Sequence, residues 1–426
     1  MNRIVYLLVK NGYLSEIKYL QFCETIEDIL FKKLSNKEYH MKKSELPDPF
    51  EKARLDKGYG IMNDQNDPVT MLLRHKDVRK SAHNYKTFQS GAQPGRIVVP
   101  SEVNIRDTRQ IPFEVDPPLH GEYRAIIEPW FKRPLLPEYQ EKLTAQISTL
   151  VDWILNKDSL EVVNEFALPL QSRALTLLLN APFSEAETWI SWGTHVFRSE
   201  GEALDGDKAN ILYNYIDEQI DRALKNPGDD MYSLLLSSEF QGKKLTREEV
   251  KGVMVLTFAG GRDTVINAVT NSISYLAEHP EALERFRQEP EIIGKAVEEF
   301  IRYFSPLTQM GRVVTEDTQV CEHAIKADSR ISLCWASANR DASVFETPNE
   351  IVLDRKINPH VGFGFSHHNC LGATHARQIL KILLKTLAEK VGSIEIKDCK
   401  ENMEHLDEFE RKVGFNSIHV KFKSLT

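Results

Sequence analysis

The chain has 426 residues, of which 41% are hydrophobic and 27% charged, and its net charge is −8. This composition supports a large buried core and excludes a disordered chain, while the acidic balance and the lack of a basic stripe argue against nucleic-acid binding. The apolar runs fall far short of the roughly 20 residues that a membrane-spanning helix needs. Five widely spaced cysteines contain no CxxC pair and fit a reducing compartment. We therefore expect a cytoplasmic enzyme with neither a membrane nor a nucleic-acid partner.

Residues 1–40 differ in character from the rest of the chain. They are rich in lysine and glutamate, and their apolar residues recur at helical spacing. Beyond them, we find no internal repeat, low-complexity tract or Gly/Ser linker that divides the chain. The sequence predicts an N-terminal helical extension over 1–40 and one large domain over 41–426.

The first part of this domain mixes short elements with a long loop. Residues 68–74 are rich in β-formers and predict a strand, and a short helix is expected over 77–82. Glycines and prolines across 91–112 predict an irregular loop. A loop of that length inside a compact domain is usually functional.

From residue 117 to about residue 389 the apolar periodicity is mostly helical. Short strands are expected near 318–322 and 329–334, and alternation over 393–423 predicts one or two hairpins. The fold class is therefore mainly α, a single large domain with a long central helix and small peripheral β-sheets. The predicted helices span 117–131, 138–156, 164–180, 185–198, 208–226, 246–279, 292–304 and 372–389.

The predicted helix over 246–279 is much longer than the others. Thr246 and Glu249 match a capping box, and Pro280 prevents continuation at the other end. Its middle is apolar on every side, yet it contains Gly260 and Gly261, each of which costs roughly 1 kcal/mol against alanine. Asp263 and Thr264 follow directly. A weakened, buried segment beside an acid and an alcohol indicates a functional distortion.

A lone cysteine carries the clearest chemical signal. Cys370 lies in a glycine-containing loop, with a helix expected to begin near Leu371. Backbone N–H groups and the positive helix end then face the sulfur and favour the thiolate. With no second cysteine nearby it cannot complete a zinc site, but it suits the axial position on haem iron. An inert, buried cysteine is the alternative that this residue alone leaves open.

The surroundings of this cysteine resemble the haem-binding signature of the cytochrome P450 family, Phe-Gly-x-Gly-x-His/Arg-x-Cys-x-Gly. Three further segments resemble motifs of that family in the same order: residues 116–124, 259–264, and Glu299 with Arg302. One position departs, because Ser366 stands where the family usually has its second glycine. The resemblance covers about residues 47–422. The residues that match the signature are Phe363, Gly364, His368, Cys370, Leu371 and Gly372.

The resemblance implies a site built around haem b, iron protoporphyrin IX. It implies that the Cys370 thiolate is the axial ligand of the iron, that Phe363 packs beside the sulfur, and that Gly364 and Gly372 belong to the ligand loop. The groups expected to neutralise the two haem propionates are His120, Arg124, Arg312 and His368.

On the other face of the haem, the resemblance assigns oxygen activation to the central helix. Gly260 and Gly261 open a groove for dioxygen, Thr264 hydrogen-bonds it, and Asp263 relays protons from solvent. Glu299 and Arg302 form a structural ion pair, whose third partner we expect to be Arg355.

The substrate is predicted from polar residues at positions that line the pocket in this family. Because apolar substrates bind poorly against unpaired polar walls, we expect a small, polar, hydroxyl-bearing substrate that is hydroxylated or oxidatively O-demethylated. The chain also looks like bacterial P450s that demethylate sugars such as 6-O-methyl-D-galactose and release formaldehyde. These polar residues are Arg96, Thr257, Thr308, Gln309 and Asn416.

Other functions remain open at this point. A P450 that hydroxylates a terpenoid or fatty acid, a peroxide-driven haem peroxygenase, a non-catalytic haem sensor or carrier, and a haem-free helical binding protein are the alternatives. Asp263 and Thr264 argue against the peroxygenase, because such family members typically lack that pair.

Electrons are expected to come from separate proteins. The chain has no flavin or iron–sulfur signature, so by family analogy a ferredoxin and its reductase supply them. Positive charge near the cysteine side of the haem suits an acidic ferredoxin. The residues expected to provide it are Lys132, Arg133, Arg377 and Lys381.

Overall fold

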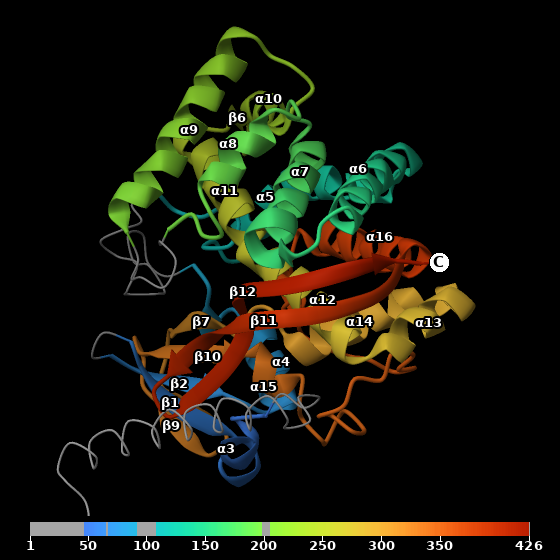
Figure 1. The fold of residues 1–426 in the computed structure, drawn as a ribbon. Helices are drawn as coiled ribbons and strands as arrows, with labels where there is room; N and C mark the ends of the chain where they lie inside the picture. The colour runs from blue at the N-terminus through green and yellow to red at the C-terminus, as the bar shows by residue number, and fades with distance from the viewer. Residues whose placement is uncertain (1–46, 65–66, 92–107, 198–204, 426) are drawn as a thin grey trace, which may run out of the picture. The chain divides into compact units, whose positions relative to one another are not determined.

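The computed structural model describes residues 47–64, 67–91, 108–197 and 205–425 (Figure 1). The predicted extension over 1–40 and most of the predicted 91–112 loop lie outside the described residues. Within the described part, no helix is both long and apolar enough to span a bilayer.

Helices make up most of the structure, as predicted. Helices α5 to α11 lie in the upper part of Figure 1, and α12, α13, α14 and α16 lie below them. The α-helices are α3 (Glu51–Asp56), α4 (His75–His83), α5 (Leu119–Phe131), α6 (Pro137–Leu155), α7 (Leu168–Leu179), α8 (Glu185–Ser191), α9 (Gly206–Lys225), α10 (Met231–Ser237), α11 (Arg247–Gly260), α12 (Asp263–Glu278), α13 (Pro280–Gln288), α14 (Ile293–Phe304), α15 (Trp335–Ala338) and α16 (Ala373–Lys390). A π-helical turn, Val163–Ala167, precedes α7, and 3₁₀ turns span Arg133–Leu135, Pro290–Ile292 and Ser366–His368.

The strands form small, separate sheets, which confirms the predicted fold class. A five-stranded sheet has the order β1-β2-β10-β7-β3, in which β2 and β10 are parallel and the other pairs antiparallel. The tail forms one long hairpin that pairs with β4. The strands are β1 (Tyr59–Asp64), β2 (Asp67–Leu72), β3 (Phe88–Gln89), β4 (Leu160–Glu161), β5 (Glu239–Phe240), β6 (Lys243–Lys244), β7 (Gln309–Val314), β8 (Thr318–Val320), β9 (His323–Ile325), β10 (Arg330–Cys334), β11 (Val391–Leu406) and β12 (Phe409–Ser424).

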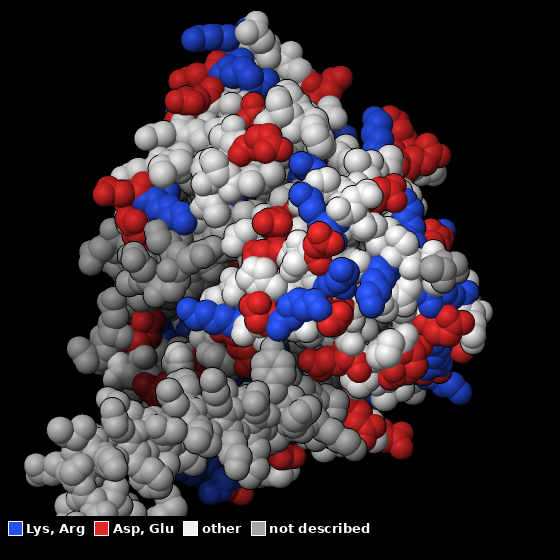
Figure 2. Space-filling view, viewed as in Figure 1, with Lys and Arg blue, Asp and Glu red and all other residues white. Residues whose placement is uncertain are grey.

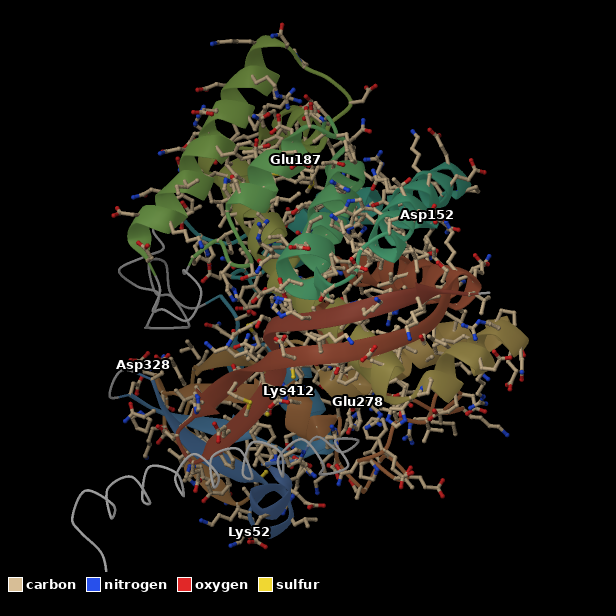
Figure 3. All side chains as sticks on the ribbon, viewed as in Figure 1. Lys52, Asp152, Glu187, Glu278, Asp328 and Lys412 are labelled. Atoms are coloured by element: carbon tan, nitrogen blue, oxygen red, sulfur yellow. The ribbon has the colours of Figure 1, made fainter. Side chains whose placement is uncertain are left out.

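The hairpin of β11 and β12 packs across α12. Gly414 makes this approach possible, because a Cβ atom there would lie 2.2 Å from Oδ1 of Asn267. Asn271 Nδ2 donates to the Val413 carbonyl at 3.0 Å. On the same hairpin, the Lys412 ammonium pairs with Glu401 at 3.1 Å (Figure 3). The close approach at Gly414 and the Asn271 hydrogen bond hold the tail against α12, while the Lys412–Glu401 pair joins the two strands of the hairpin.

Charged side chains of both signs are interspersed over the visible face of the molecule (Figure 2). Many of them form pairs within or between helices, such as Lys142 with Glu138 at 2.7 Å. The chain has 54 basic and 62 acidic side chains, so its net charge of −8 is small for its 116 charged residues. The mixed surface agrees with this near balance of charge.

The predicted single helix over 246–279 is wrong: the structure divides it into α11 and α12. The capping box of Thr246 and Glu249 is present at its start, and Pro280 begins α13 rather than extending α12. The division lies at Gly261 and Arg262, where Arg262 has φ −101° and ψ −83°, outside the helical region. Side chains from other elements make this break stable, as described below.

Smaller differences have local causes. The predicted helix over 185–198 ends at Ser191, because Gly193 has a φ of +76° that a helix cannot contain. Helices α10 and α13 were not predicted, and neither were strands β1 and β7. These elements are short, with six to nine residues each, so their periodicity carries little signal.

A buried ion-pair network joins α14 to the loop that leads toward Cys370. Arg302 donates to both oxygens of Glu299 at 2.8 Å, and Arg355 Nε donates to Glu299 at 2.9 Å. Arg302 also donates to the carbonyls of Pro348 and Glu350, each at 2.7 Å. Burial raises the pKa of Glu299, but these hydrogen bonds outweigh it and hold the pKa below its usual range.

We expect Arg302→Ala to lower the free energy of unfolding by about 3–5 kcal/mol, because it leaves a buried carboxylate and several buried carbonyls without their donor. Arg285→Ala is the matched control. Arg285 also pairs with two carboxylates, at 3.3 and 3.1 Å, but on the surface, where the loss should stay below about 1 kcal/mol. Urea unfolding followed by circular dichroism measures both, and equal losses would contradict the role of the network.

Candidate active site

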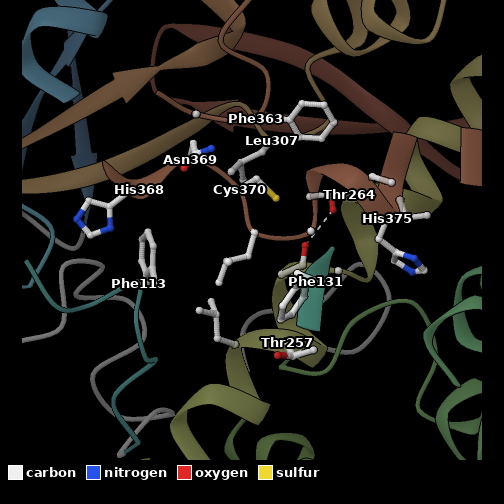
Figure 4. Close-up of a pocket in the computed structure, with 18 of the residues that line it drawn as sticks. Phe113, Phe131, Thr257, Thr264, Leu307, Phe363, His368, Asn369, Cys370 and His375 are labelled. Carbon is white, nitrogen blue, oxygen red and sulfur yellow. Dashed lines mark hydrogen bonds between the residues drawn. The ribbon is translucent and has the colours of Figure 1, made fainter. Parts of the chain in front are cut away.

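A cavity of about 250 Å³ lies between the ends of several helices and the loop that carries Cys370 (Figure 4). Its walls come from α5, α7, α11, α12, β7, α15 and α16, and from the 362–372 loop. Most of the lining is aliphatic or aromatic, including Phe113, Phe131, Leu307 and Met310. Cys370, Thr257 and Thr264 also face it, so the two motifs that the sequence singled out meet at one cavity.

The Cys370 loop is a tight turn held by backbone hydrogen bonds. Cys370 N donates to the Phe363 carbonyl at 2.8 Å. Gly364 has φ +75°, a left-handed conformation that glycine adopts without strain. Ser366, at the position where glycine is usual, also has a positive φ of 66°. Its hydroxyl lies 2.8 Å from Nδ1 of His83.

The electrostatics at the sulfur are balanced between opposing effects. Cys370 is exposed, but onto the cavity that it lines. Burial raises the pKa of its thiol, while the N–H of Gly372 and the guanidinium groups of Arg124 and Arg377 act in the opposite direction. Burial prevails, so the pKa of the thiol lies above its ordinary value, while the N–H groups at the helix start act toward the thiolate as predicted. The helix begins at Ala373, two residues later than predicted.

The four predicted propionate partners lie together at one side of this cavity. His120, Arg124, Arg312 and His368 all contribute to its lining. The imidazole rings of His120 and His368 have centroids 4.3 Å apart. Burial, with His368 and Arg124 nearby, lowers the pKa of His120 to about 3. Burial also lowers the pKa of His368, although its contact with Asp116 acts in the opposite direction, so both imidazoles favour the neutral form and the arginines supply the positive charge.

Arg312 is a buried cation without a carboxylate in hydrogen-bonding contact among the described residues. Its side chain is 2% exposed, and its one hydrogen bond in this part of the chain goes to the neighbouring Gly311 carbonyl at 2.7 Å. Burial lowers the pKa of Arg312 to about 10. Because a buried guanidinium is costly without an acceptor, its place on the cavity wall suits an anionic ligand.

Sequence reasoning missed two residues that shape this side. Asn369 accepts from Arg124 through its carbonyl at 2.8 Å and through its side chain at 3.1 Å. Asp116 accepts from His368 at 3.2 Å and from the N–H of Gly91 at 2.6 Å. Asn369 directly precedes the cysteine, and Asp116 is the first residue of the predicted 116–124 motif. Their positions within these motifs were the sequence signal that could have identified them as site residues.

The break between α11 and α12 forms another wall. Thr264 Oγ donates to the Gly260 carbonyl at 3.1 Å, and Gln171 Nε2, on α7, donates to the Gly261 carbonyl at 3.0 Å. Nothing in the sequence pointed to Gln171. Gly260 and Gly261 line the cavity, and no side chain or distant backbone atom lies within 4 Å of a Cβ built at Gly260. The space beside Gly260 is therefore open.

Asp263 begins α12 and accepts from the N–H of Thr264 at 3.0 Å. Its side chain is 34% exposed. Of the described residues, Thr264 lines the cavity whereas Asp263 does not. The acid and the alcohol therefore stand between solvent and the cavity, in that order.

Three of the predicted pocket residues are placed elsewhere, which corrects the sequence reading. Thr308 is buried, hydrogen-bonds Glu404 and accepts from Arg411 at 2.7 Å. Gln309 hydrogen-bonds Ser332, and the exposed Asn416 donates to the Glu401 carbonyl at 3.1 Å. Thr257 alone of the five lines the cavity, and Arg96 lies outside the described residues. The polar side chains of Thr308, Gln309 and Asn416 hydrogen-bond residues that are distant in the sequence instead of facing the cavity.

Two of the four residues predicted to form a basic surface for a ferredoxin are engaged in contacts within the protein. Arg377 donates to Glu298 at 2.7 Å and lies over the Phe363 ring at 4.3 Å. Arg133 donates to the Leu178 carbonyl at 3.1 Å. Lys132 and Lys381 are exposed.

Comparison with known proteins identifies the scaffold. The model of the family described as Cytochrome P450 matches residues 206–391. The "Biotin biosynthesis cytochrome P450" of Bacillus subtilis (strain 168) is 32% identical over 288 residues, which cover 66% of this chain and 73% of that protein. The chain belongs to the cytochrome P450 family.

Two further P450s illustrate the range of the likeness. "Linalool 8-monooxygenase" of Pseudomonas putida is 28% identical over 342 residues, 76% of this chain and 83% of that protein. The solved structure described as "The structure of a carbohydrate active P450" is 83% identical, with a TM-score of 0.88, and the match covers 90% of this chain and all of that one. The chain is therefore an oxidoreductase of the P450 monooxygenase type.

P450s bind haem through a cysteine thiolate, and the residues present fit this cofactor. The cavity has one cysteine sulfur on its wall, a hydrophobic lining for a porphyrin, and the Arg312 and Arg124 guanidinium groups for its carboxylates. The carboxylate acceptor that Arg312 lacks among the described residues is of the kind that a haem propionate supplies.

Gly260→Ala tests whether the open space beside the helix break serves turnover. We expect the free energy of unfolding to stay unchanged or rise by up to about 1 kcal/mol, because alanine favours helix. Turnover should fall about tenfold or more, because the added methyl group enters the cavity and displaces the dioxygen or the substrate from its reactive position. Gly294→Ala, on the exposed side of α14 and equally free of neighbours, is the control that leaves turnover unchanged. A loss of stability without a loss of turnover would contradict this account.

Proposed function

We propose that this P450 oxidatively O-demethylates a small methylated sugar, with 6-O-methyl-D-galactose as the best candidate, and that electrons reach it from a ferredoxin and its reductase. The observation that carries the proposal is the 83% identity, over 90% of the chain, to a P450 described as carbohydrate active. At this identity most pocket residues are expected to be shared between the two proteins.

The reaction balances as a monooxygenation. One oxygen atom of dioxygen enters a C–H bond of the methyl ether, the other leaves as water, and two electrons and two protons are consumed. The hydroxymethyl ether then breaks its C–O bond to give the sugar alcohol and formaldehyde. Bound haem supplies the activation of dioxygen. The protein supplies the binding, the orientation and the protons.

The apolar cavity is compatible with this substrate because the reacting end of the sugar is a methyl group. A methoxy group loses little when it is placed among Leu307, Met310 and Val253. The sugar hydroxyls need polar partners, and Thr257 offers one. Its hydroxyl donates to the Val253 carbonyl at 2.8 Å, which leaves the oxygen free to accept from a sugar hydroxyl.

We assign the remaining roles by residue. Cys370 provides the thiolate ligand, Phe363 shields it, and Gly364 and Gly372 give the ligand loop its shape. The propionates are held by Arg312 and Arg124, together with His120 and His368. The ion pair of Glu299 and Arg302 anchors the loop around Pro348 and Glu350, which precedes the ligand loop.

Proton delivery is assigned to the helix break. The Asp263 carboxylate takes protons from solvent, and the Thr264 hydroxyl, which donates to Gly260 in this structure, turns to donate into the cavity. The Gly260–Gly261 segment leaves room for dioxygen beside that hydroxyl.

The mostly apolar lining favours a second candidate, hydroxylation of an apolar substrate such as a terpenoid or a fatty acid. Cavity walls of this kind gain affinity from apolar ligands through burial alone. The likeness to linalool 8-monooxygenase is compatible with this alternative but is much weaker.

We expect the holoenzyme, supplied with ferredoxin and reductase, to release one formaldehyde for each 6-O-methyl-D-galactose consumed. The same sugar should shift the haem from low to high spin as it displaces water. D-Galactose is the control, because it has the same hydroxyls but no methyl ether and should give no formaldehyde. Absence of a spin shift and of formaldehyde with the methylated sugar, together with turnover of linalool or palmitate, would favour the second candidate.

Asp263→Asn should slow turnover about 100-fold, because a positioned proton donor contributes on this order to rate. The dissociation constant from the spin shift should stay within about twofold of the wild type, since Asp263 does not line the cavity. Electrons should instead appear as hydrogen peroxide. Peroxide-supported turnover that exceeds the ferredoxin-supported rate in the wild type would point to a peroxygenase.

A further inference from the structure

The two oxygens of the Asp263 carboxylate face different partners. Oδ1 accepts from the N–H of Thr264 at 3.0 Å. Oδ2 lies 3.5 Å from Nδ1 of His195, whose side chain is 18% exposed. His195 lies in the segment that follows α8, almost seventy residues before Asp263 in the sequence. The contact is thus made by tertiary structure alone.

A second set of contacts fixes the distance between these two segments. Arg262, the residue before Asp263, is buried, and its Nε donates to the Gly193 carbonyl at 2.7 Å. Its guanidinium group also hydrogen-bonds the Trp189 carbonyl, at the last turn of α8. Gly193 takes a φ of +76° and redirects the chain two residues before His195. Arg262 therefore braces the backbone next to Asp263 against the backbone next to His195.

Nε and Nη2 of Arg262 donate to the two carbonyls, while its buried Nη1 has no hydrogen-bond partner among the described residues. Burial lowers the pKa of Arg262 to about 10, and the charge of the neighbouring Asp263 carboxylate acts against that change. His195 is consequently the imidazole that this arrangement brings to the carboxylate. The N–H of Thr264 and the imidazole of His195 contact different oxygens of the carboxylate, so together they restrict its rotation about the last side-chain bond.

We propose that His195 is a positioning residue for proton delivery, holding Oδ2 of Asp263 so that the carboxylate stays oriented between solvent and Thr264. This inference rests on the proton-delivery role assigned to Asp263 above. Loss of the imidazole removes one of the contacts that restrict the carboxylate, and a larger share of electrons is then lost as peroxide.

The test is a double-mutant cycle on the holoenzyme with ferredoxin and reductase. The rates are dioxygen uptake, which can be followed with any substrate that binds, and formaldehyde release from 6-O-methyl-D-galactose. The variants are His195→Ala, Asp263→Asn and the double variant. We expect His195→Ala to slow both rates by roughly 3- to 10-fold, and the double variant to be no slower than Asp263→Asn, because the histidine acts only through the carboxylate.

Two further variants separate positioning from general support of the fold. His195→Gln retains a side-chain N–H donor and should recover the rates to within about threefold of the wild type. His279→Ala is the matched control, because His279 is similarly half-buried and lies 3.1 Å from Glu281. It should change neither rate.

The outcomes distinguish the two proposals. If Asp263→Asn slows dioxygen uptake while His195→Ala leaves it within twofold of the wild type, the role of His195 is overturned and that of Asp263 stands. If the losses multiply in the double variant, His195 acts independently of the carboxylate and the inference is also overturned. If Asp263→Asn has no effect, the assigned proton delivery fails first. If formaldehyde is absent in the wild type, the substrate proposal fails while the cycle on dioxygen uptake still decides the role of His195.

Discussion

Two backbone carbonyls at the end of α11 determine how the active site is built. The carbonyls of Gly260 and Gly261 lose their helical partners at the break. Gly260 is exposed onto the cavity and Gly261 is half-buried, so both carbonyls need new donors when a bound molecule excludes water from the cavity. Thr264 supplies a donor from within α12, and Gln171 supplies one from α7. With both satisfied, the helix stays open beside the cavity, and Thr264 faces inward while Asp263 remains in contact with solvent.

The wall that carries the cysteine depends on a different constraint, close packing against α14. Gly362 lies so near this helix that a Cβ atom would come within 2.7 Å of Ile301. The next residue of α14 is Arg302, which with Glu299 holds the loop around Pro348 and Glu350. One helix thus supports both the approach to the ligand loop and the start of that loop. A buried ion pair is expensive to desolvate, but here each charged group has several hydrogen-bonding partners.

The cavity combines an apolar lining with charge at one side only. Arg312 and Arg124 concentrate positive charge where an anionic group is held, while the wall around Leu307 and Met310 offers no polar contact. A methyl ether and a hydrocarbon both suit such a wall. The substrate is therefore distinguished by its polar end, for which the described lining provides the hydroxyl of Thr257 in addition to that of Thr264.

Local motifs were readable from the sequence because neighbours along the chain determine them. The capping box at Thr246, the stop at Pro280, the turn before Cys370 and the i,i+3 pair of Glu299 with Arg302 all depend on short spacings. Arg355, which was expected as the third partner although the family element around Pro348 departs here, does donate to Glu299. The order of these motifs was sufficient to indicate the family, the fold class and the cofactor.

Long-range partners decided the rest. The sequence could not indicate that Thr308 would be used by Glu404, 96 residues away, or that Gln171 would hold the helix break open. Nor did the pattern of the 185–198 segment place His195 beside Asp263. The sequence by itself determined which chemical groups the protein possesses and the local turns that carry them. The tertiary structure decided which of those groups face the cavity, because a polar side chain bonds to whichever partner the packing of distant elements brings within reach.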